Sequence, residues 1–381
     1  MKRFLAIVLA LAMVFALCAC GGNDKANETD KPDTAAYKVA MITDYGDITD
    51  QSFNQTTYEA CKAFCDKNSV EFKYYKPTAD STAARVEMVE QAVAEGFNVI
   101  VMPGFAFAGT IAECQDTYPD VKFIGLDVSE FDLYDSFYNH DKDNNRTDLK
   151  DPNNKEHISK NVYCAVYQEE LCGYMAGYAA VKLGYTKLGF LGGMAVPAVI
   201  RYGYGFVQGA DAAAKELGVN VEVMYNYTGA FAATPEAQAM AASWYQNGTE
   251  VVFGCGGAVG NSVMAAAEEA GAKVIGVDVD QSGESDTVIT SAMKMLSNSV
   301  YDGVKAFYDG SFPGGQTSVF TAENDGVGLP METSKFESFT QADYDALFAD
   351  MKAGKITINN NTEDSTTADL TLSNTKVSFV E

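Results

Sequence analysis

The sequence is poor in histidine and in positive charge. It has two His among 381 residues, and 27 Lys and Arg against 52 Asp and Glu, which gives a formal net charge of -25 at pH 7. Because phosphate backbones are bound by clusters of Lys and Arg, this balance disfavours nucleic acid as a partner. His140 and His157 lie beside or within a polar stretch that ends at Lys160, so we expect no catalytic histidine, no metal and no cofactor.

The common catalytic motifs are also absent. There is no Gly-x-Ser-x-Gly elbow, no Walker loop and no Cys–His pair. Asp278-Val279-Asp280 superficially resembles an acidic calcium motif, but a nucleoside hydrolase needs a dense carboxylate cluster near its N-terminus and an acid for the leaving group. We therefore expect a binding protein and hold a nucleoside-processing enzyme as the least favoured alternative.

Cysteine is too sparse and too scattered for a disulfide framework. Eight are present, of which Cys18 and Cys20 belong to the N-terminal segment. Cys61 and Cys65 are spaced to share one face of a helix, but no second close pair with His completes a zinc site. We expect the remaining cysteines to be small buried hydrophobic residues.

The N-terminus has the pattern of a bacterial export signal. Lys2 and Arg3 precede an apolar run over residues 4–17, and Leu-Cys-Ala-Cys follows at 17–20. This order resembles a lipobox, which predicts a signal over residues 1–19, lipid on Cys20 and attachment to the extracytoplasmic face of the cell membrane. An ordinary secretory signal that leaves Cys20 free is the alternative. The polar residues that follow, up to about 36, predict a flexible tether.

After the tether, short apolar runs alternate with longer amphipathic ones. This rhythm is typical of parallel α/β structure, and about 345 residues exceed one comfortable core, so we expect two α/β domains. The predicted strands are 38–43, 70–75, 98–102, 121–126, 161–166, 187–191, 219–225, 250–255, 273–278 and 288–293. The predicted helices are 52–67, 82–95, 108–117, 168–183, 200–217, 235–247, 259–270 and 340–352.

The first predicted strand leads into an acidic turn. Ser52 and Gln55 match a capping box that opens the following helix. Ligands of parallel sheets bind at the carboxyl ends of the strands, so the side chains of this turn are candidate contacts. A solvated acidic loop with a core Phe is the alternative. The candidates are Asp44, Asp47, Asp50, Phe53 and Asn54.

Other predicted strands also end in glycine or a carboxylate. Glycine lets a ligand approach the backbone, and an aspartate accepts both donors of a vicinal diol or of a base edge. Tight packing of helix on sheet, or a helix cap, would explain each feature taken alone. These strand ends are Gly104, Asp127, Gly256 with Gly257, and Asp278.

Taken together, these motifs resemble the basic membrane protein family of purine nucleoside receptors, the substrate-binding lipoproteins of ABC importers. The segments that carry the resemblance are Thr43-Asp44, Ser52-Phe53-Asn54-Gln55, Gly173 with Ala176-Gly177-Tyr178, Gly189 to Met194, Gly229-Ala230-Phe231, Gly256-Gly257 with Gly260-Asn261, and Gly276 to Gln281. The resemblance implies an α/β type I periplasmic-binding fold of two doubly wound lobes joined by three crossovers, near Tyr163, Lys294 and residue 320. The lobes would be 37–163 with 295–320, and 164–294 with 321–381.

The resemblance also implies a purine nucleoside ligand: guanosine, inosine or adenosine. Phe53 and Phe231 would stack on the two faces of the base. The remaining implied contacts are Asp44, Asn54 and Asp127 to the base, and Asp278, the Gly256-Gly257 backbone and Lys294 to the ribose. The chain departs from the family pattern at Ala195, at Ala230 and in a long insertion over 133–160.

Two other binding functions stay open. A receptor of the same fold for a sugar or a signalling furanose would also use stacked Phe rings, although Asn54 with Asp127 suits a purine edge. A surface receptor without a transporter would share every feature above. As an importer component the protein would act with a permease and an ATPase on other chains, and we expect a monomer.

Overall fold

The computed structural model describes residues 37–44, 46–140 and 158–380. The predicted signal, Cys20, the tether and residues 141–157 of the insertion lie outside the described residues. Within the described part of the chain, no helix combines the length and the apolar character that a membrane span requires.

The first lobe is built on a six-stranded parallel sheet in the order β11-β5-β4-β3-β1-β2. Its strands are β1 (Lys38–Ile42), β2 (Glu71–Tyr75), β3 (Val99–Pro103), β4 (Lys122–Leu126), β5 (Val162–Tyr167) and β11 (Gln316–Phe320). Its helices are α2 (Phe53–Asn68), α3 (Thr82–Ala94), α4 (Phe107–Cys114), α5 (Glu130–His140) and α10 (Leu296–Tyr308). Every residue of the central strand β3 is buried, as a strand covered by helices on both faces requires.

The second lobe is built on a seven-stranded sheet in the order β12-β10-β9-β8-β6-β7-β13, parallel except for the β10–β12 pair. Its strands are β6 (Lys187–Gly192), β7 (Val221–Tyr227), β8 (Val251–Cys255), β9 (Lys273–Asp278), β10 (Val288–Lys294), β12 (Val327–Gly328) and β13 (Thr375–Phe379). Its helices are α6 (Glu169–Lys182), α7 (Pro197–Leu217), α8 (Pro235–Gln246), α9 (Val259–Ala270) and α11 (Gln341–Lys352).

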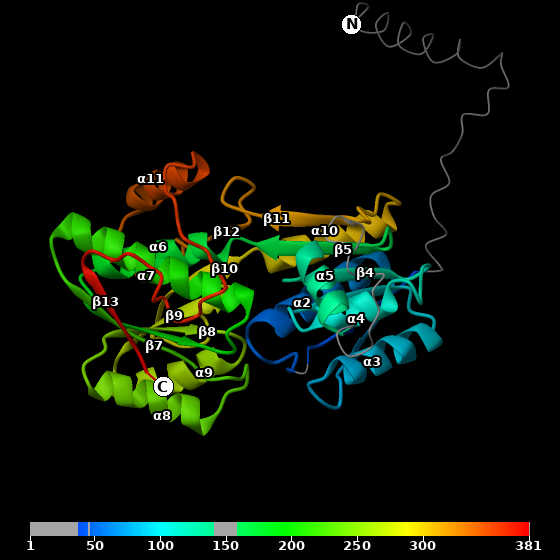
Figure 1. The fold of residues 1–381 in the computed structure, drawn as a ribbon, viewed down its shortest axis with the longest axis horizontal. Helices are drawn as coiled ribbons and strands as arrows, with labels where there is room; N and C mark the ends of the chain where they lie inside the picture. The colour runs from blue at the N-terminus through cyan, green and yellow to red at the C-terminus, as the bar shows by residue number, and fades with distance from the viewer. Residues whose placement is uncertain (1–36, 45, 141–157, 381) are drawn as a thin grey trace, which may run out of the picture. The chain divides into compact units, whose positions relative to one another are not determined.

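The two sheets repeat one strand order. The run β2-β1-β3-β4-β5 in the first lobe corresponds to β7-β6-β8-β9-β10 in the second. Figure 1 labels β4 and β5 of the first run and β7 to β10 of the second. In each run the strand order reverses beside the first strand, and ligands of such sheets bind at that reversal, outside the carboxyl ends of the strands. Binding residues are therefore expected after β1 and β3 in the first lobe, and after β6 and β8 in the second.

The chain changes sheets three times. It leaves the first sheet after β5, returns between β10 and α10, and leaves again between β11 and β12. The crossover that we placed near Tyr163 falls inside β5, because Cys164 and Ala165 still pair with β4 and the strand continues alongside β11 to Tyr167.

Several elements were not anticipated from the sequence. Helices α5 and α10 and strands β11 to β13 did not follow from the apolar rhythm. Helix α5 occupies the start of the segment that we assigned to a polar insertion, and Leu133 within it is fully buried. The insertion therefore begins as part of the first-lobe core.

The N-terminal caps of α11 and α2 differ. Thr340 caps α11, because the Thr340 hydroxyl accepts from the Asp343 amide and the Asp343 side chain accepts from the Thr340 amide. The Ser52 capping box of α2 is wrong. The Ser52 side chain makes no cap bond, and the Asp50 carboxylate instead accepts the amides of Ser52, Asn54 and Gln55 at 2.9, 3.0 and 3.0 Å.

The cysteines behave as small core residues, as expected. The six from Cys61 to Cys255 are buried and free. Burial raises the pKa of Cys65 and of Cys114 to about 12 in each case, so both thiols stay protonated and unreactive at neutral pH.

Candidate ligand-binding site

A cavity of about 800 Å³ lies at the carboxyl ends of the strands of both sheets. It is lined by the loops after β1 and β2, the ends of β3, β4, β9 and β10, and the loops after β6, β7 and β8. All nine residues that the family resemblance implies as ligand contacts lie on its wall: Asp44, Phe53, Asn54, Asp127, Phe231, Gly256, Gly257, Asp278 and Lys294. Residues far apart in the chain are thus brought to one site.

The loop after β1 is fixed by two carboxylates that share the Asn54 amide. The Asn54 Nδ2 group donates to Asp44 Oδ1 at 3.2 Å and to Asp50 Oδ2 at 3.0 Å. Both of its hydrogens are therefore used, whereas the buried Asn54 Oδ1 has no hydrogen-bond partner. Asn54 consequently offers the cavity an acceptor.

Asp127 offers a second acceptor from the end of β4. Its Oδ2 accepts from the Lys294 ammonium at 2.6 Å, and its buried Oδ1 has no hydrogen-bond partner. Burial raises the pKa of Asp127 to about 7, against the opposing effect of Lys294. The residue also has a left-handed backbone with φ of 56°. Such strained non-glycine positions cluster at functional sites.

Lys294 lies at the centre of the polar part of the site. Its ammonium is 2.6 Å from Asp127, 3.4 Å from Glu169 and 3.6 Å from Asp278. It also lies 4.7, 5.2 and 5.6 Å from the ring centroids of Phe53, Tyr167 and Tyr202. Lys294 is 3% exposed, so it is a buried cation and not the exposed charge at a strand end that the sequence alone would allow. Its neighbouring carboxylates raise its pKa despite burial, so it stays protonated.

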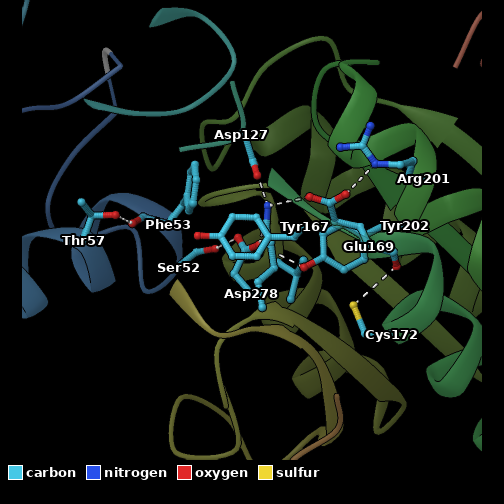
Figure 2. A network of polar contacts seen from close by, with 12 residues as sticks. Ser52, Phe53, Thr57, Asp127, Tyr167, Glu169, Cys172, Arg201, Tyr202 and Asp278 are labelled. Atoms are coloured by element: carbon cyan, nitrogen blue, oxygen red, sulfur yellow. Dashed lines mark hydrogen bonds and ion pairs between the residues drawn. The ribbon is translucent and has the colours of Figure 1, made fainter. Parts of the chain in front are cut away.

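Asp278 joins the two lobes. Its Oδ2 accepts from the Ser52 hydroxyl of the first lobe at 2.6 Å, and its Oδ1 accepts from the Tyr202 hydroxyl at 3.3 Å (Figure 2). A further bond between the lobes runs from Gln281 Nε2 to the Gln51 carbonyl at 2.8 Å. The lobes are therefore in direct contact beside the cavity.

The Phe231 ring lies against backbone that only glycine permits. A Cβ on Gly193 would come within 2.4 Å of the ring, and one on Gly256 within 3.0 Å. Gly256 and Gly257 also have φ of 130° and 51°. The Phe231 carbonyl accepts from the Ala258 amide at 2.9 Å. The two glycines after β8 thus hold Phe231 in place, a packing role beside any contact with ligand.

This arrangement suits the binding of a flat, polar ligand. Two aromatic rings, two buried acceptors without partners and one buried cation line the same space. Among the described residues, no group of three or more His, Cys, Asp or Glu side chains is arranged to hold a metal ion.

Sequence reasoning missed several residues of the site. Tyr202 lines the cavity from α7, and Glu169 and Arg201 lie next to it and extend the charge network. A signal was present, because Arg201 is the one charged residue in the largely apolar run from 194 to 207, and such a charge in a buried helix needs a partner. Which carboxylate pairs with it depends on how α6 packs on α7.

Comparisons with known proteins agree with the fold. The chain is 27% identical over 360 residues to the ABC transporter nucleoside-binding protein BmpA of Lactococcus lactis subsp. cremoris, covering 88% of this chain and 93% of that one. It is 26% identical over 324 residues to basic membrane protein D of Borreliella burgdorferi, covering 83% and 85%. A solved ABC transporter solute-binding protein from Aeropyrum pernix superposes with a TM-score of 0.71 at 20% identity, covering 87% of this chain and 95% of that one.

A family model for PnrA-like ABC transporter substrate-binding proteins matches residues 37–362, which include the whole cavity wall and every strand of both sheets except β13. The likeness to the Aeropyrum pernix structure shows the fold, and the type I periplasmic-binding fold expected from the sequence is confirmed. The chain therefore belongs to the Bmp family of ABC transporter substrate-binding proteins.

Proposed function

We propose that this protein binds a purine nucleoside between its lobes as the extracytoplasmic, lipid-anchored component of an ABC importer. Lipid on Cys20 would attach it to the cell membrane, and a permease and an ATPase would complete the importer. Membership of the substrate-binding family supports the importer role, and the name of the Lactococcus relative supports a nucleoside. The lipobox pattern at 17–20 supports the anchor.

The observation that carries the nucleoside proposal is the pairing of two rings with two unpartnered acceptors. Phe53 and Phe231 come from different lobes and line one cavity. A flat base stacked between them would bury both of its faces. The edge of that base would meet Asn54 Oδ1 and Asp127 Oδ1, which are acceptors that need donors. A purine with N–H groups on its Watson–Crick edge, such as guanine or hypoxanthine, meets this requirement.

Asp278 and Lys294 supply the proposed contacts to the sugar. An aspartate accepts both hydroxyls of a vicinal diol, and the ammonium donates to a ribose oxygen. Six carboxylates line the cavity, whereas Lys76 and Lys294 are the lining cations among the described residues. The carboxylates belong to Asp44, Asp47, Asp50, Asp80, Asp127 and Asp278. This excess of negative charge favours a neutral ligand.

A thermal-shift screen of the protein without its signal tests the proposal. A ligand that binds only the native state raises the unfolding midpoint. We expect shifts with purine nucleosides and none with ribose or glucose. A shift with sugars alone would replace the nucleoside by a sugar ligand in the same fold, and a null result with every nucleoside would overturn the proposal. Hydrolysis products in the incubated samples would favour an enzyme.

A further inference from the structure

Glu169 contacts the lining residue Lys294 but does not itself line the cavity. It is the first residue of α6, directly after the chain leaves β5, and it is fully buried. Its Oε1 lies 3.4 Å from the Lys294 ammonium, and its Oε2 accepts from Arg201 Nε at 2.6 Å (Figure 2). A side chain in this position acts on a ligand only through Lys294 or through its field.

Close helix packing fixes Glu169. A Cβ on Gly173 would come within 2.3 Å of the Tyr202 carbonyl, and one on Gly205 within 2.1 Å of the Glu170 carbonyl. These glycines let α6 and α7 approach backbone to backbone, which sets the Glu169–Arg201 pair. Buried ion pairs hold their geometry well when each oxygen has a partner, as both Glu169 oxygens do.

The Lys294 ammonium lies near three carboxylates, those of Asp127, Glu169 and Asp278. A carboxylate that attracts the ammonium away from Asp127 leaves Asp127 less stabilised as an anion, and adds its own repulsion. Several charged or titratable groups besides its direct partner Lys294 therefore act on Asp127. They are Glu169, Asp278, Arg201 and the Tyr167 hydroxyl.

We propose that Glu169, held by Arg201, is a positioning residue that sets the pH range in which the site binds its ligand. The proposal rests on the nucleoside function above, in which Asp127 accepts an N–H from the base. Glu169 acts by sharing Lys294 with Asp127, so it controls how readily Asp127 becomes the anion that accepts best.

The directions of the pKa shifts agree with this geometry. Burial and the charges of Glu169 and Asp278 raise the pKa of Asp127, and Lys294 opposes them, with a result of about 7. Against its burial, Arg201 and Lys294 hold the pKa of Glu169 below its ordinary value. Glu169 is therefore an anion throughout the range in which Asp127 titrates.

The affinity of the site for a ligand that donates a hydrogen bond to Asp127 should rise with pH. Below pH 7 the free site holds a proton on Asp127, which a donor ligand must displace. Affinity for inosine, whose N1–H is a donor, should therefore rise with pH and level off above about 7. The midpoint of this pH dependence is the pH at which Asp127 is half protonated in the free site. Well below it, the affinity for inosine should rise almost tenfold per pH unit, because binding releases one proton.

The variants Glu169→Gln and Arg201→Gln should move this midpoint in opposite directions. Without the Glu169 charge, the Lys294 ammonium stabilises the Asp127 anion more strongly, so the midpoint falls by on the order of one pH unit. Without Arg201, Glu169 has Lys294 as its one cationic partner and attracts it more strongly. A positive charge near Asp127 is also lost, so the midpoint rises. A purely structural role would weaken binding at every pH without moving the midpoint.

Glu170→Gln is the matched control. Glu170 is the next residue and is also buried, but its Oε1 accepts from Asn360 Nδ2 at 2.9 Å, and no hydrogen bond or ion pair joins it to Lys294. Its neutralisation should leave the midpoint unchanged. It tests whether any buried carboxylate near α6 has the same effect.

Calorimetric titration of inosine into wild type and the three variants, across about two pH units on either side of 7, gives the midpoints. A wild-type midpoint retained in Glu169→Gln, or an equal shift in Glu170→Gln, would overturn the inference while leaving nucleoside binding intact. If Glu169→Gln fails to fold, an unmoved midpoint in Arg201→Gln overturns it. Absence of purine nucleoside binding by wild type would instead overturn the proposed function, and the inference with it.

Discussion

Asp127 and Asp278 occupy corresponding places in the two lobes. Asp127 follows β4 and Asp278 ends β9, and these strands hold the same position in the repeated strand order. Both residues have a left-handed backbone, with φ of 56° and 65°, and both reach Lys294, at 2.6 and 3.6 Å. The fold therefore builds the same acidic position twice and turns both copies toward one cation.

Their surroundings differ, and the difference separates two tasks. Asp278 accepts from Ser52 across the lobes and from Tyr202 within its own lobe, so each of its oxygens already has a donor. Asp127 Oδ1 is buried and has none. One aspartate thus ties the lobes together beside the proposed ribose, while the other keeps an open acceptor for the proposed base. Fold position fixes where a carboxylate lies, and its neighbours decide what it can do.

Removal of the shared cation should have the largest effect on this pair. Lys294→Met would leave three buried carboxylates, from Asp127, Glu169 and Asp278, without their common partner. We expect a loss of about 3–5 kcal/mol in the free energy of unfolding, measured by urea denaturation, and no measurable inosine binding.

Lys62→Met is the control for this prediction. Lys62 forms a solvent-exposed ion pair with Asp66, so its loss should hardly change the free energy of unfolding. Similar losses in the two variants would mean that the buried charge network contributes no more to the free energy of unfolding than an exposed ion pair does.

Separate neutralisation of the two aspartates tests the division of tasks. Asp278→Asn should weaken inosine by about 1.5–3 kcal/mol but leave the free base hypoxanthine nearly unaffected, because only the riboside has the diol. Asp127→Asn should weaken both ligands. Calorimetry with the two ligands measures each loss, and equal loss of both ligands in Asp278→Asn would refute its ribose role.

Loss of either ring tests whether both lobes stack on the base. Phe53→Ala and Phe231→Ala should each weaken inosine by on the order of 1–3 kcal/mol while the fold stays intact. Phe53→Tyr, which keeps a ring, should bind within a few-fold of wild type. An effect confined to one ring, measured by titration, would mean that the base lies against a single lobe.

The sequence predicted the parts of the molecule that local pattern determines. The apolar run before Asp44 and the acidic turn after it identified β1 and its loop, because a buried strand and a strand-end carboxylate are both visible over a few residues. The family resemblance then named residues that turned out to share one cavity wall. Strands β11 and β13 were missed because their apolar content is low and they are defined by pairing with β5 and β7.

The charge network behind the wall was beyond sequence reasoning for a different reason. Glu169 and Arg201 meet only because four glycines bring α6 and α7 together, at Gly173, Gly177, Gly205 and Gly209. The error at Ser52 has a similar origin. Its spacing to Gln55 suits a local cap, but the hydroxyl donates to Asp278, which lies 226 residues away. Local spacing could not reveal a partner on the other lobe.

The smallest predicted effect concerns that bond between the lobes. Ser52→Ala removes one hydrogen bond that exists only while the lobes are in contact, so it should weaken inosine and hypoxanthine alike by about 1 kcal/mol, roughly fivefold. Thr57→Ala is the matched control, because the Thr57 hydroxyl donates within its own helix to the Phe53 carbonyl at 2.8 Å. A Ser52→Ala loss seen only with ribosides would assign Ser52 to the ribose together with Asp278. A loss shared by both ligands, with Thr57→Ala unchanged, would mean that closure of the lobes itself contributes to affinity.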